Sequence, residues 1–295
     1  MLGMQAPATG EEAHLTAAGD GKLEFTFVRG KTAVTSVCAL YPLKLVIPAP
    51  TQTTGCFVEN RVSRDCAWVY MIGHGGGMVS GDRSRIVCRV GENCSAVLTT
   101  QASTKIYHQL SNKFSTQYLD VTVGAGGLLA LVPDPVVPYA RSRYIQKQTF
   151  RVCGFNTGNP GSIAVVDWIT CGRRASGEIW DMEHLESTND VYNDEDLVVH
   201  DSLRLSVLDG SFLSVRQRME PFMCMANVIL LGPRVSKVSK QVLVAIAERQ
   251  SERIQRPICE SNTASGRMKR GRLTCLSLPR SFCFQTSRPL CTHCM

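Results

Sequence analysis

The chain has 295 residues, 44% of them apolar and 19% charged, which is enough for one large domain or two ordinary ones with a hydrophobic core and excludes a disordered, collagen-like or low-complexity protein. The net charge of +7 does not indicate nucleic-acid binding, because residues 261–295 hold six Lys or Arg and no Asp or Glu. Residues 1–260 therefore carry 26 basic and 25 acidic side chains, a net charge of +1.

The apolar runs of the sequence are too short to cross a membrane, since none approaches eighteen residues. Residues 1–15 are polar and lack the basic start of a signal peptide. Of the 13 cysteines, five fall in the last 37 residues and the other eight show no regular spacing, which favours a reducing compartment. We therefore expect a cytoplasmic protein that binds neither membranes nor nucleic acid.

The first half of the chain has the patterns of β-strands. Residues 1–20 have no periodicity and are predicted to form a flexible leader. Lys22–Val28 alternates apolar and polar residues, and a turn leads into the β-branched run Thr32–Leu40, so we expect a hairpin. The segments 85–101 and 118–134 each place a Val-Gly turn between two strand-like runs, and the two turns lie 33 residues apart. They predict hairpins or coils stacked side by side.

Strand patterns continue at residues 162–170, 197–209 and 227–231. After the breaker Gly232-Pro233, apolar residues recur at helical spacing to about residue 254, with Ser236 as the expected N-cap. The predicted fold class is mainly β, a β-helix-like stack of strands and hairpins with one or two late α-helices.

One glycine-rich motif suggests an enzyme. His74-Gly75-Gly76-Gly77 is similar to the oxyanion loop of esterases, whose backbone N–H groups stabilise a tetrahedral anion, and Ser80 is the candidate nucleophile. The chain contains no G-x-S-x-G nucleophile elbow and no alternation of strands with long helices. A tight glycine turn between strands is therefore favoured, with a serine hydrolase using His74–Gly77 as the alternative.

The C-terminal segment offers a second alternative. Cys291-x-x-Cys294 is half of a zinc pattern, which would fit a zinc-binding interaction module. Residues 256–295 lack apolar periodicity and are rich in Arg, Ser and Pro, which favours a disordered tail over a zinc site. The histidines are scattered singly, so we expect no tightly bound metal or cofactor.

Five charged residues lie among the predicted strands. Because a charge in an apolar run is costly to bury, each needs a partner, a water-filled passage or a ligand. Ordinary ion pairing or surface exposure is the alternative interpretation. The five residues are Asp82, Lys105, Asp134, Asp167 and Glu178.

Several motifs follow one another in a characteristic order between about residues 14 and 255. They are YPLKLVIP (Tyr41–Pro48), GHGGGMVSGDR (Gly73–Arg83), LTTQASTKIYH (Leu98–His108), LVPDPVVPYARSRY (Leu131–Tyr144) and VVDWITCGRRASGEIWD (Val165–Asp181). In this order and spacing they resemble the UreD family of urease accessory proteins, called UreH in some bacteria. The opening HLTAAGDGKLEFTFVRG and the stretch STNDVY are most similar to plant or algal members.

The resemblance implies a chaperone for nickel insertion without catalytic residues or enzymatic activity. Family members bind apo-urease and urease accessory protein F, which in turn docks the nickel-carrying GTPase, accessory protein G. Their fold is a β-helix-like stack thought to enclose a polar tunnel for nickel in transit. Carboxylates and water would hold such a cation weakly, as transfer requires. By motif, the resemblance assigns five residues to the tunnel or its mouth: Asp82, Lys105, Asp134, Asp167 and Glu178. The glycines of the family motif are Gly75, Gly76, Gly77 and Gly81.

The end of the chain departs from the family. Members continue after the late helix into another strand, whereas residues 256–295 of this chain match no part of that pattern. We therefore expect a leader (1–20), a UreD-like β-rich domain (21–255) and an atypical basic, Cys-rich tail (256–295). If the missing strand packs on the stack, the chain would expose a sheet edge and would be impaired in function.

Overall fold

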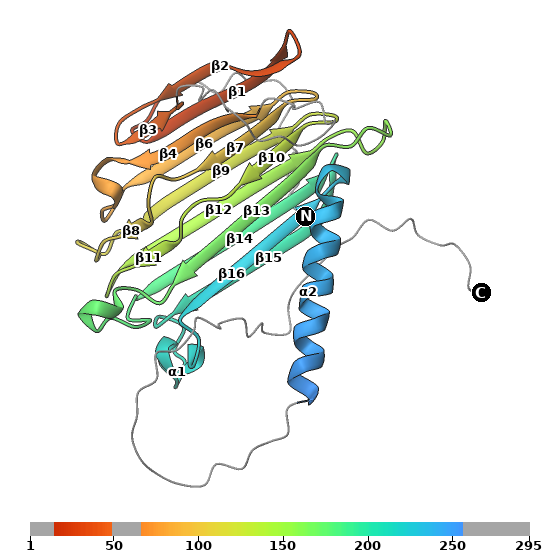
Figure 1. The fold of residues 1–295 in the computed structure, drawn as a ribbon. Helices are drawn as coiled ribbons and strands as arrows, with labels where there is room; N and C mark the ends of the chain where they lie inside the picture. The colour runs from red at the N-terminus through yellow and green to blue at the C-terminus, as the bar shows by residue number, and fades with distance from the viewer. Residues whose placement is uncertain (1–14, 49–65, 256–295) are drawn as a thin grey trace, which may run out of the picture.

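The computed structural model of the protein describes residues 15–48 and 66–255. Its strands form two sheets that stack on each other (Figure 1). The seven-stranded sheet has the order β15-β14-β12-β9-β6-β1-β2, with β1 Asp20–Val28, β2 Lys31–Ala39, β6 Arg83–Val90, β9 Ser115–Val123, β12 Arg143–Val152, β14 His184–Asn193 and β15 Asp196–Ser206. The nine-stranded sheet has the order β3-β4-β7-β10-β13-β11-β8-β5, with β16 beside β13. Its strands are β3 Leu43–Val46, β4 Ala67–Gly73, β5 Gly77–Met78, β7 Ser95–Thr99, β8 Thr104–Ile106, β10 Leu128–Leu131, β11 Val136–Pro138, β13 Ser162–Thr170 and β16 Cys224–Leu231. The predicted mainly β class is confirmed.

The central strands form a parallel coil. In one sheet β6, β9, β12 and β14 pair in parallel, and in the other β4, β7, β10 and β13 do so. The Val-Gly corners carry the chain from one sheet to the other, between β6 and β7 and between β9 and β10. At the second corner Gly124 N–H donates to the carbonyl of Val90, so each corner is stacked on the coil before it. Of the two arrangements that the sequence left open, the segments 85–101 and 118–134 form stacked coils and not hairpins.

Antiparallel pairs complete the sheets. The predicted hairpin is β1 paired with β2, and Arg29 and Gly30 have the positive φ values, 51° and 82°, that a two-residue turn requires. The strand predicted at 162–170 is β13. The strands predicted at 197–209 and 227–231 are β15, which pairs with β14, and β16, which pairs with β13.

Two α-helices follow late in the chain, as predicted: α1 Val215–Met219 and α2 Ser236–Gln255. The expectation that Ser236 caps α2 is wrong, because this residue is already helical (φ −58°, ψ −37°) and its hydroxyl donates to the carbonyl of Pro233 at 2.8 Å. The short 3₁₀ turn η3 (Pro233–Val235) precedes α2 and takes the place of a cap. Within the described ranges, no helix combines the length and the apolar character that crossing a membrane requires.

The space between the sheets contains two apolar clusters that lie toward opposite ends of the strands. Along β13, Val165 belongs to the first cluster, Ile169 belongs to the second, and Asp167 lies between them. Along β12, Phe150 and Tyr144 likewise belong to different clusters. A polar layer therefore separates two hydrophobic cores.

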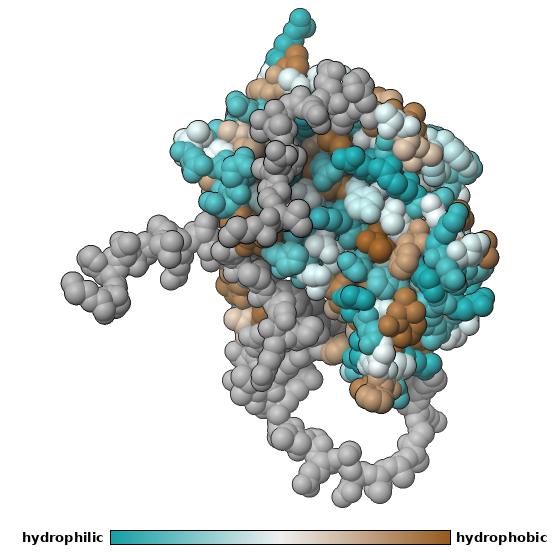
Figure 2. All heavy atoms as spheres, turned by 180° about the vertical axis from the view of Figure 1, so that it is seen from behind, coloured by the Kyte–Doolittle hydropathy of each residue, from teal (hydrophilic) through white to brown (hydrophobic). Residues whose placement is uncertain are grey.

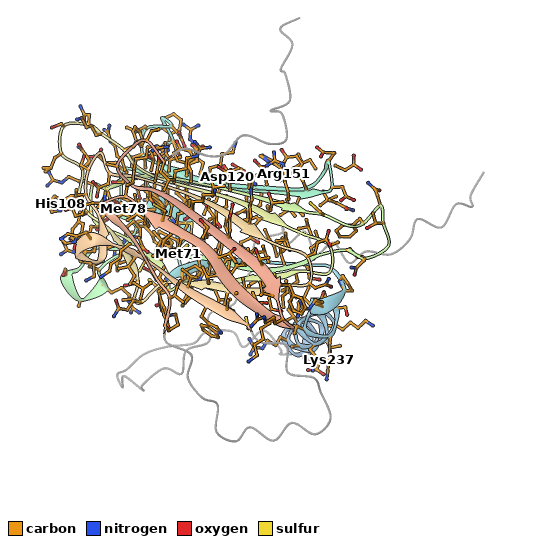
Figure 3. All side chains as sticks on the ribbon, turned by 90° about the horizontal axis from the view of Figure 1, so that it is seen from above. Met71, Met78, His108, Asp120, Arg151 and Lys237 are labelled. Carbon is orange, nitrogen blue, oxygen red and sulfur yellow. The ribbon has the colours of Figure 1, made fainter. Side chains whose placement is uncertain are left out.

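The outer surfaces of the molecule differ from this interior. In Figure 3, Asp120 of β9 and Arg151 of β12 lie on one side of the molecule, Lys237 of α2 lies on the opposite side, and Met71 of β4 lies between them. Figure 2, which shows the back of the view in Figure 1, presents a mainly hydrophilic surface with scattered hydrophobic residues. Helix α2 is thus confined to one side, beside β16.

Candidate functional site

A polar layer crosses the inner face of the seven-stranded sheet. Paired residues of neighbouring parallel strands point to the same side, so inward-facing side chains form rows across the sheet. Two adjacent rows carry polar side chains. One row is Ser84, Gln117, Gln146 and Ser187, and the next is Ile86, Leu119, Gln148 and Asn189. The row that follows is wholly apolar and consists of Cys88, Val121, Phe150 and Val191.

Asp167 of β13 lies at the centre of this layer and is 9% exposed. Its carboxylate accepts hydrogen bonds from Gln146 Nε2 at 2.9 Å, Ser187 Oγ at 2.7 Å and Asn189 Nδ2 at 3.0 Å. All three donors are neutral, so hydrogen bonds alone compensate the buried charge. Because Asp167 belongs to the nine-stranded sheet and its donors to the other, the network ties the two sheets together.

Tyr144 extends the network toward the second apolar cluster. Its hydroxyl lies 2.9 Å from Gln146 Oε1. Burial, and to a lesser degree the charge of Asp167, raises the pKa of Tyr144 well above its ordinary value, so the phenol stays protonated at neutral pH. Tyr144 can therefore donate its one hydroxyl proton to Gln146 Oε1 or to Gln117 Oε1, which lies 3.0 Å away, while Gln146 Nε2 faces Asp167.

The nine-stranded sheet is interrupted at the level of the polar layer. The chain leaves the sheet for a few residues between successive strands: at 74–76 between β4 and β5, at 100–103 between β7 and β8, and at 132–135 between β10 and β11. We call these three segments the gaps; β13 continues past them without a break. The three gaps fall in the motifs HGGG, TTQAST and VPDP. The most characteristic motifs of the sequence thus coincide with a break in the hydrogen-bonded ladder.

Side chains replace the missing ladder across these gaps. Asp134 N–H donates to Thr100 Oγ1 at 2.8 Å. The Trp168 indole N–H donates to the carbonyl of Pro133, also at 2.8 Å. The gap segments are therefore held in place, although Pro133 and Pro135 cannot donate backbone hydrogen bonds.

A cavity of about 160 Å³ lies where the polar layer meets the gaps, ample for several water molecules. Three of the five charged residues predicted from the sequence line it, and they come from three separate motifs: Asp82, Asp134 and Asp167. Two of the motif glycines, Gly76 and Gly77, line it as well. Gln146 and Gln148 of β12 form part of the opposite wall.

Asp82 is held by a tight turn between β5 and β6. Its N–H donates to the carbonyl of Val79, and the Val79 N–H donates back to Asp82 Oδ2, both at 2.9 Å. Gly81 has a φ of +89°, a backbone conformation that residues other than glycine rarely adopt. The turn therefore orients the Asp82 carboxylate. The other two motif glycines with positive φ, Gly75 and Gly76, lie in the first gap.

Lys105 lies beside Gly77 but does not line the cavity. A Cβ at Gly77 would lie 2.3 Å from the Lys105 carbonyl oxygen, so the approach of β5 to β8 requires glycine there. Thr104 lines the cavity, and side chains alternate along a strand, so Lys105 points to the other side of β8.

Glu178 is also outside the cavity, in an ion pair with Arg173. It accepts hydrogen bonds from Arg173 Nη2, from Arg173 Nε at 2.9 Å and from the Ala140 N–H at 3.1 Å. These bonds to Arg173 hold the pKa of Glu178 below its usual value, against the opposing effect of burial. Arg173 in turn stacks on Tyr139, with 4.0 Å from its guanidinium carbon to the ring centroid. The pair neutralises Glu178, which distinguishes it from Asp167.

The cavity carries an excess of negative charge. The one basic residue of its lining, Arg83, donates to Asp20 Oδ1 at 2.7 Å. Burial tends to raise the pKa of Asp20, but hydrogen bonds from Ala17 N–H and Arg83 outweigh this effect and lower it. Within the two described ranges, none of the carboxylates Asp82, Asp134 and Asp167 forms an ion pair with Lys or Arg.

The polar ligand atoms around the cavity are oxygens. Its lining contains no Cys or His, and two thioethers, Met71 and Met78, add weak sulfur acceptors (Figure 3). Among the residues that the structure describes, no three His, Cys, Asp or Glu lie close enough to hold a metal. Burial raises the pKa of the Cys88 thiol, one row away, to about 12, so that thiol is protonated at neutral pH. Such walls suit a hard or borderline cation that keeps much of its water.

The serine hydrolase alternative receives no support from this geometry. The Ser80 hydroxyl donates to the carbonyl of Leu110 at 2.6 Å, and the ring of His74 packs on Tyr41 at 5.1 Å between centroids. In residues 15–48 and 66–255 no histidine is hydrogen-bonded to Ser80, as activation of a serine nucleophile requires. The motif His74–Gly77 forms the predicted turn between strands.

The sequence did not single out the polar side chains around Asp167, of which Gln146, Ser187 and Asn189 donate to it. Gln146 and Gln148 lie on β12, and Ser187 and Asn189 lie on β14, two strands for which no prediction was made. The alternation of side chains along a strand would have identified the two glutamines of β12, because they point to the same face as the buried Phe150. The predicted leader up to residue 14 and the tail from residue 256, with Cys291 and Cys294, lie outside the described residues.

Comparison with known proteins points in the same direction as the motifs. The model of a family described as "UreD urease accessory protein" matches residues 17–277, beyond the predicted end of the β-rich domain. Urease accessory protein D of Arabidopsis thaliana is 37% identical over 237 residues, which are 80% of this chain and 75% of that protein.

Two further relatives extend the comparison to a second plant and to bacteria. Urease accessory protein D of Oryza sativa subsp. japonica is 38% identical over 254 residues, 86% of this chain and 77% of the relative. Urease accessory protein UreD of Sorangium cellulosum is 36% identical over 226 residues, 77% of this chain and 65% of the relative. The similarity thus covers most of the chain and includes the segments that line the cavity.

Proposed function

Because the chain belongs to the UreD family of urease accessory proteins, we propose that it acts as a scaffold and nickel conduit in urease maturation. A role in urease maturation follows from membership of the family. The finer proposal is that the chain binds apo-urease on one side and accessory proteins F and G on the other. Nickel then passes through the cavity between the two sheets on its way to urease. The protein itself catalyses no reaction.

One observation carries the conduit proposal. Asp82, Asp134 and Asp167 are far apart in the sequence, yet they line one cavity. Three carboxylates without Lys or Arg partners among the described residues lower the electrostatic potential there and attract a cation. At Asp167, the buried one of the three, a structural role alone would favour a neutral or paired side chain.

The oxygen ligands of the cavity also fit a protein that passes nickel on better than one that stores it. A conduit must bind its cargo favourably enough to admit it and weakly enough to release it. Asp167 already accepts three hydrogen bonds, so at most part of its coordinating capacity is available to a cation. Oxygen donors spread along the walls would hold a hydrated Ni²⁺ briefly at each position.

The scaffold proposal is tested by reconstitution. Tagged full-length chain is co-expressed with apo-urease and accessory proteins F and G, and nickel-dependent urease activity is measured with the chain present or omitted. We expect capture of apo-urease and F on the tagged chain, and activation only when the chain is present. Capture of neither partner, with equal activation in both cases, would contradict the proposal.

The conduit proposal is tested by Asp167→Asn, with Asp120→Asn as the matched control. Asp120 undergoes the same chemical change on the outer side of β9, away from the cavity (Figure 3). We expect Asp167→Asn to lower the rate of nickel-dependent activation by about tenfold while apo-urease and F are still captured. Asp120→Asn should activate like the wild type. Full activation by Asp167→Asn would rule out a role for the cavity in nickel transfer.

A further inference from the structure

Two amide side chains next to Asp167 have oxygen atoms without a partner. Gln148 Oε1 and Asn189 Oδ1 are buried and receive no hydrogen bond within the described part of the chain. Gln148 is 4% exposed and Asn189 is fully buried. Leaving a buried acceptor unsatisfied costs about 1–3 kcal/mol, so native proteins contain few of them. Each such atom requires an explanation, such as a bound water or ion.

The two residues are neighbours. Gln148 of β12 is directly paired with Asn189 of β14, so both side chains point from adjacent strands toward the space between the sheets. Gln148 lines the cavity, and Asn189 donates to Asp167, which also lines it. Of the two residues, Gln148 is the one whose side chain lines the cavity, and Asn189 lies next to it in the same row.

Hydrogen bonding fixes the orientation of the Asn189 amide. Its Nδ2 donates to Asp167 Oδ2 at 3.0 Å and to Asp201 Oδ2 at 3.4 Å. Asp201 is itself held by Asn227 Nδ2 at 2.7 Å. Ionised carboxylates only accept hydrogen bonds, so rotating the amide would place oxygen against oxygen. The orientation of the Asn189 amide is thus fixed, with its nitrogen toward the two carboxylates and its carbonyl oxygen turned away from them.

We propose that the amide oxygen of Gln148 forms a binding site for the hydrated divalent cation, next to Asp167. This inference rests on the proposed conduit function and names a neutral ligand of the same path. Amide carbonyls are oxygen ligands without charge, so they can replace water around a cation while binding it more weakly than carboxylates. Alternation of charged and neutral oxygens would let the cation move from Asp167 to the next position.

The test uses two variants that each remove one unpartnered buried amide. Gln148→Leu removes the amide at the cavity and leaves the bonds of Asp167 intact. The control is Asn193→Val, because Asn193 Oδ1 is also buried without a partner but lies at the end of β14, away from the cavity. The full-length variants are compared with Asp167→Asn in thermal unfolding, in equilibrium dialysis against Ni²⁺, and in nickel-dependent urease activation.

We expect Gln148→Leu to unfold at the wild-type midpoint or above it, since it removes an unsatisfied polar group. Its affinity for Ni²⁺ and its activation rate should nevertheless fall about tenfold, while Asn193→Val keeps both. If Gln148→Leu keeps the wild-type Ni²⁺ affinity and activation rate while Asp167→Asn loses both, the proposed Gln148 site is wrong and the conduit proposal is unaffected. Equal losses in Gln148→Leu and Asn193→Val would contradict the Gln148 site as well, because they would indicate an effect of core packing. An unchanged Ni²⁺ affinity and activation rate in Asp167→Asn would contradict both the conduit and the Gln148 binding site.

Discussion

The apolar clusters and the polar layer are built on the same strands but differ in what they contribute. Along β13, Val165 and Ile169 are buried against apolar neighbours, while Asp167 between them is buried with its charge held by three neutral donors. Burial of apolar surface stabilises the fold by about 25 cal/mol per Å². A buried carboxylate at best offsets its own desolvation. The apolar clusters therefore account for more of the stability of the fold than the polar layer, and such an imbalance is expected of a functional site.

The largest effect is expected from a cavity in an apolar cluster. Phe150 is fully buried in the first cluster, so Phe150→Ala should lower the free energy of unfolding by about 3–5 kcal/mol. Denaturant unfolding of the full-length chain measures this loss. A loss below about 1 kcal/mol would show that the first cluster is not the main source of stability.

A smaller effect is expected from the polar layer. Ser187→Ala removes one of the three donors to Asp167, and hydrogen bonds to charged groups contribute about 1.5–3 kcal/mol each. We expect a loss of this size in the same unfolding experiment. Ser202→Ala, on the neighbouring strand β15, serves as the control and should change stability by less than about 0.5 kcal/mol. Equal losses in both variants would contradict a specific role of Ser187.

The ion pair outside the layer should contribute less still. Arg173 is 40% exposed, so solvent screens the pair, and Glu178→Gln should cost at most about 1 kcal/mol at pH 7. The pKa of Glu178 is lower in the folded protein than in the unfolded chain, where it is about 4.3. The stabilisation is therefore present above that value and is lost as the pH falls through the folded pKa. Wild type and Glu178→Gln should converge in stability in acid, and a difference that grows as the pH falls would contradict this account.

The smallest effect is expected from His184, which is 6% exposed. Burial lowers its pKa, so the unfolded chain binds a proton more readily than the folded protein. The contribution is complete above the ordinary pKa of about 6.5 and decreases as the pH falls below it. Between pH 7.5 and 5.5, the wild type should lose slightly more stability than His184→Gln. Parallel curves for the two proteins would show that His184 is not linked to folding in this range.

Much of the fold follows from local patterns in the sequence. Alternation predicted the hairpin of β1 and β2, and the apolar run 162–170 predicted β13. The paired Val-Gly corners indicated stacking, but the choice between hairpins and coils depends on contacts between segments more than 30 residues apart. Such pairing is not encoded in any one segment.

The site was predictable in part, for a related reason. A charge within an apolar run identified Asp167, and short motifs identified Asp82 and Asp134. Glu178 resembled them in sequence, yet its nearby Arg173 pairs with it, which the spacing of five residues permits without requiring it. Gln146 and Gln148 look ordinary in a sequence until their strand is placed with its inner face toward the other sheet.

The central claim is that the layer between the sheets accepts a cation, and anomalous diffraction tests it most directly. Crystals of the full-length chain are soaked in Ni²⁺, and data are collected on both sides of the nickel absorption edge. We predict a nickel peak inside the cavity, within coordination distance of oxygen atoms of Asp167, Asp134 or Gln148 or of their bound waters. Nickel on exposed histidines such as His108 and His200, with no peak in the cavity at the same Ni²⁺ concentration, would contradict the claim.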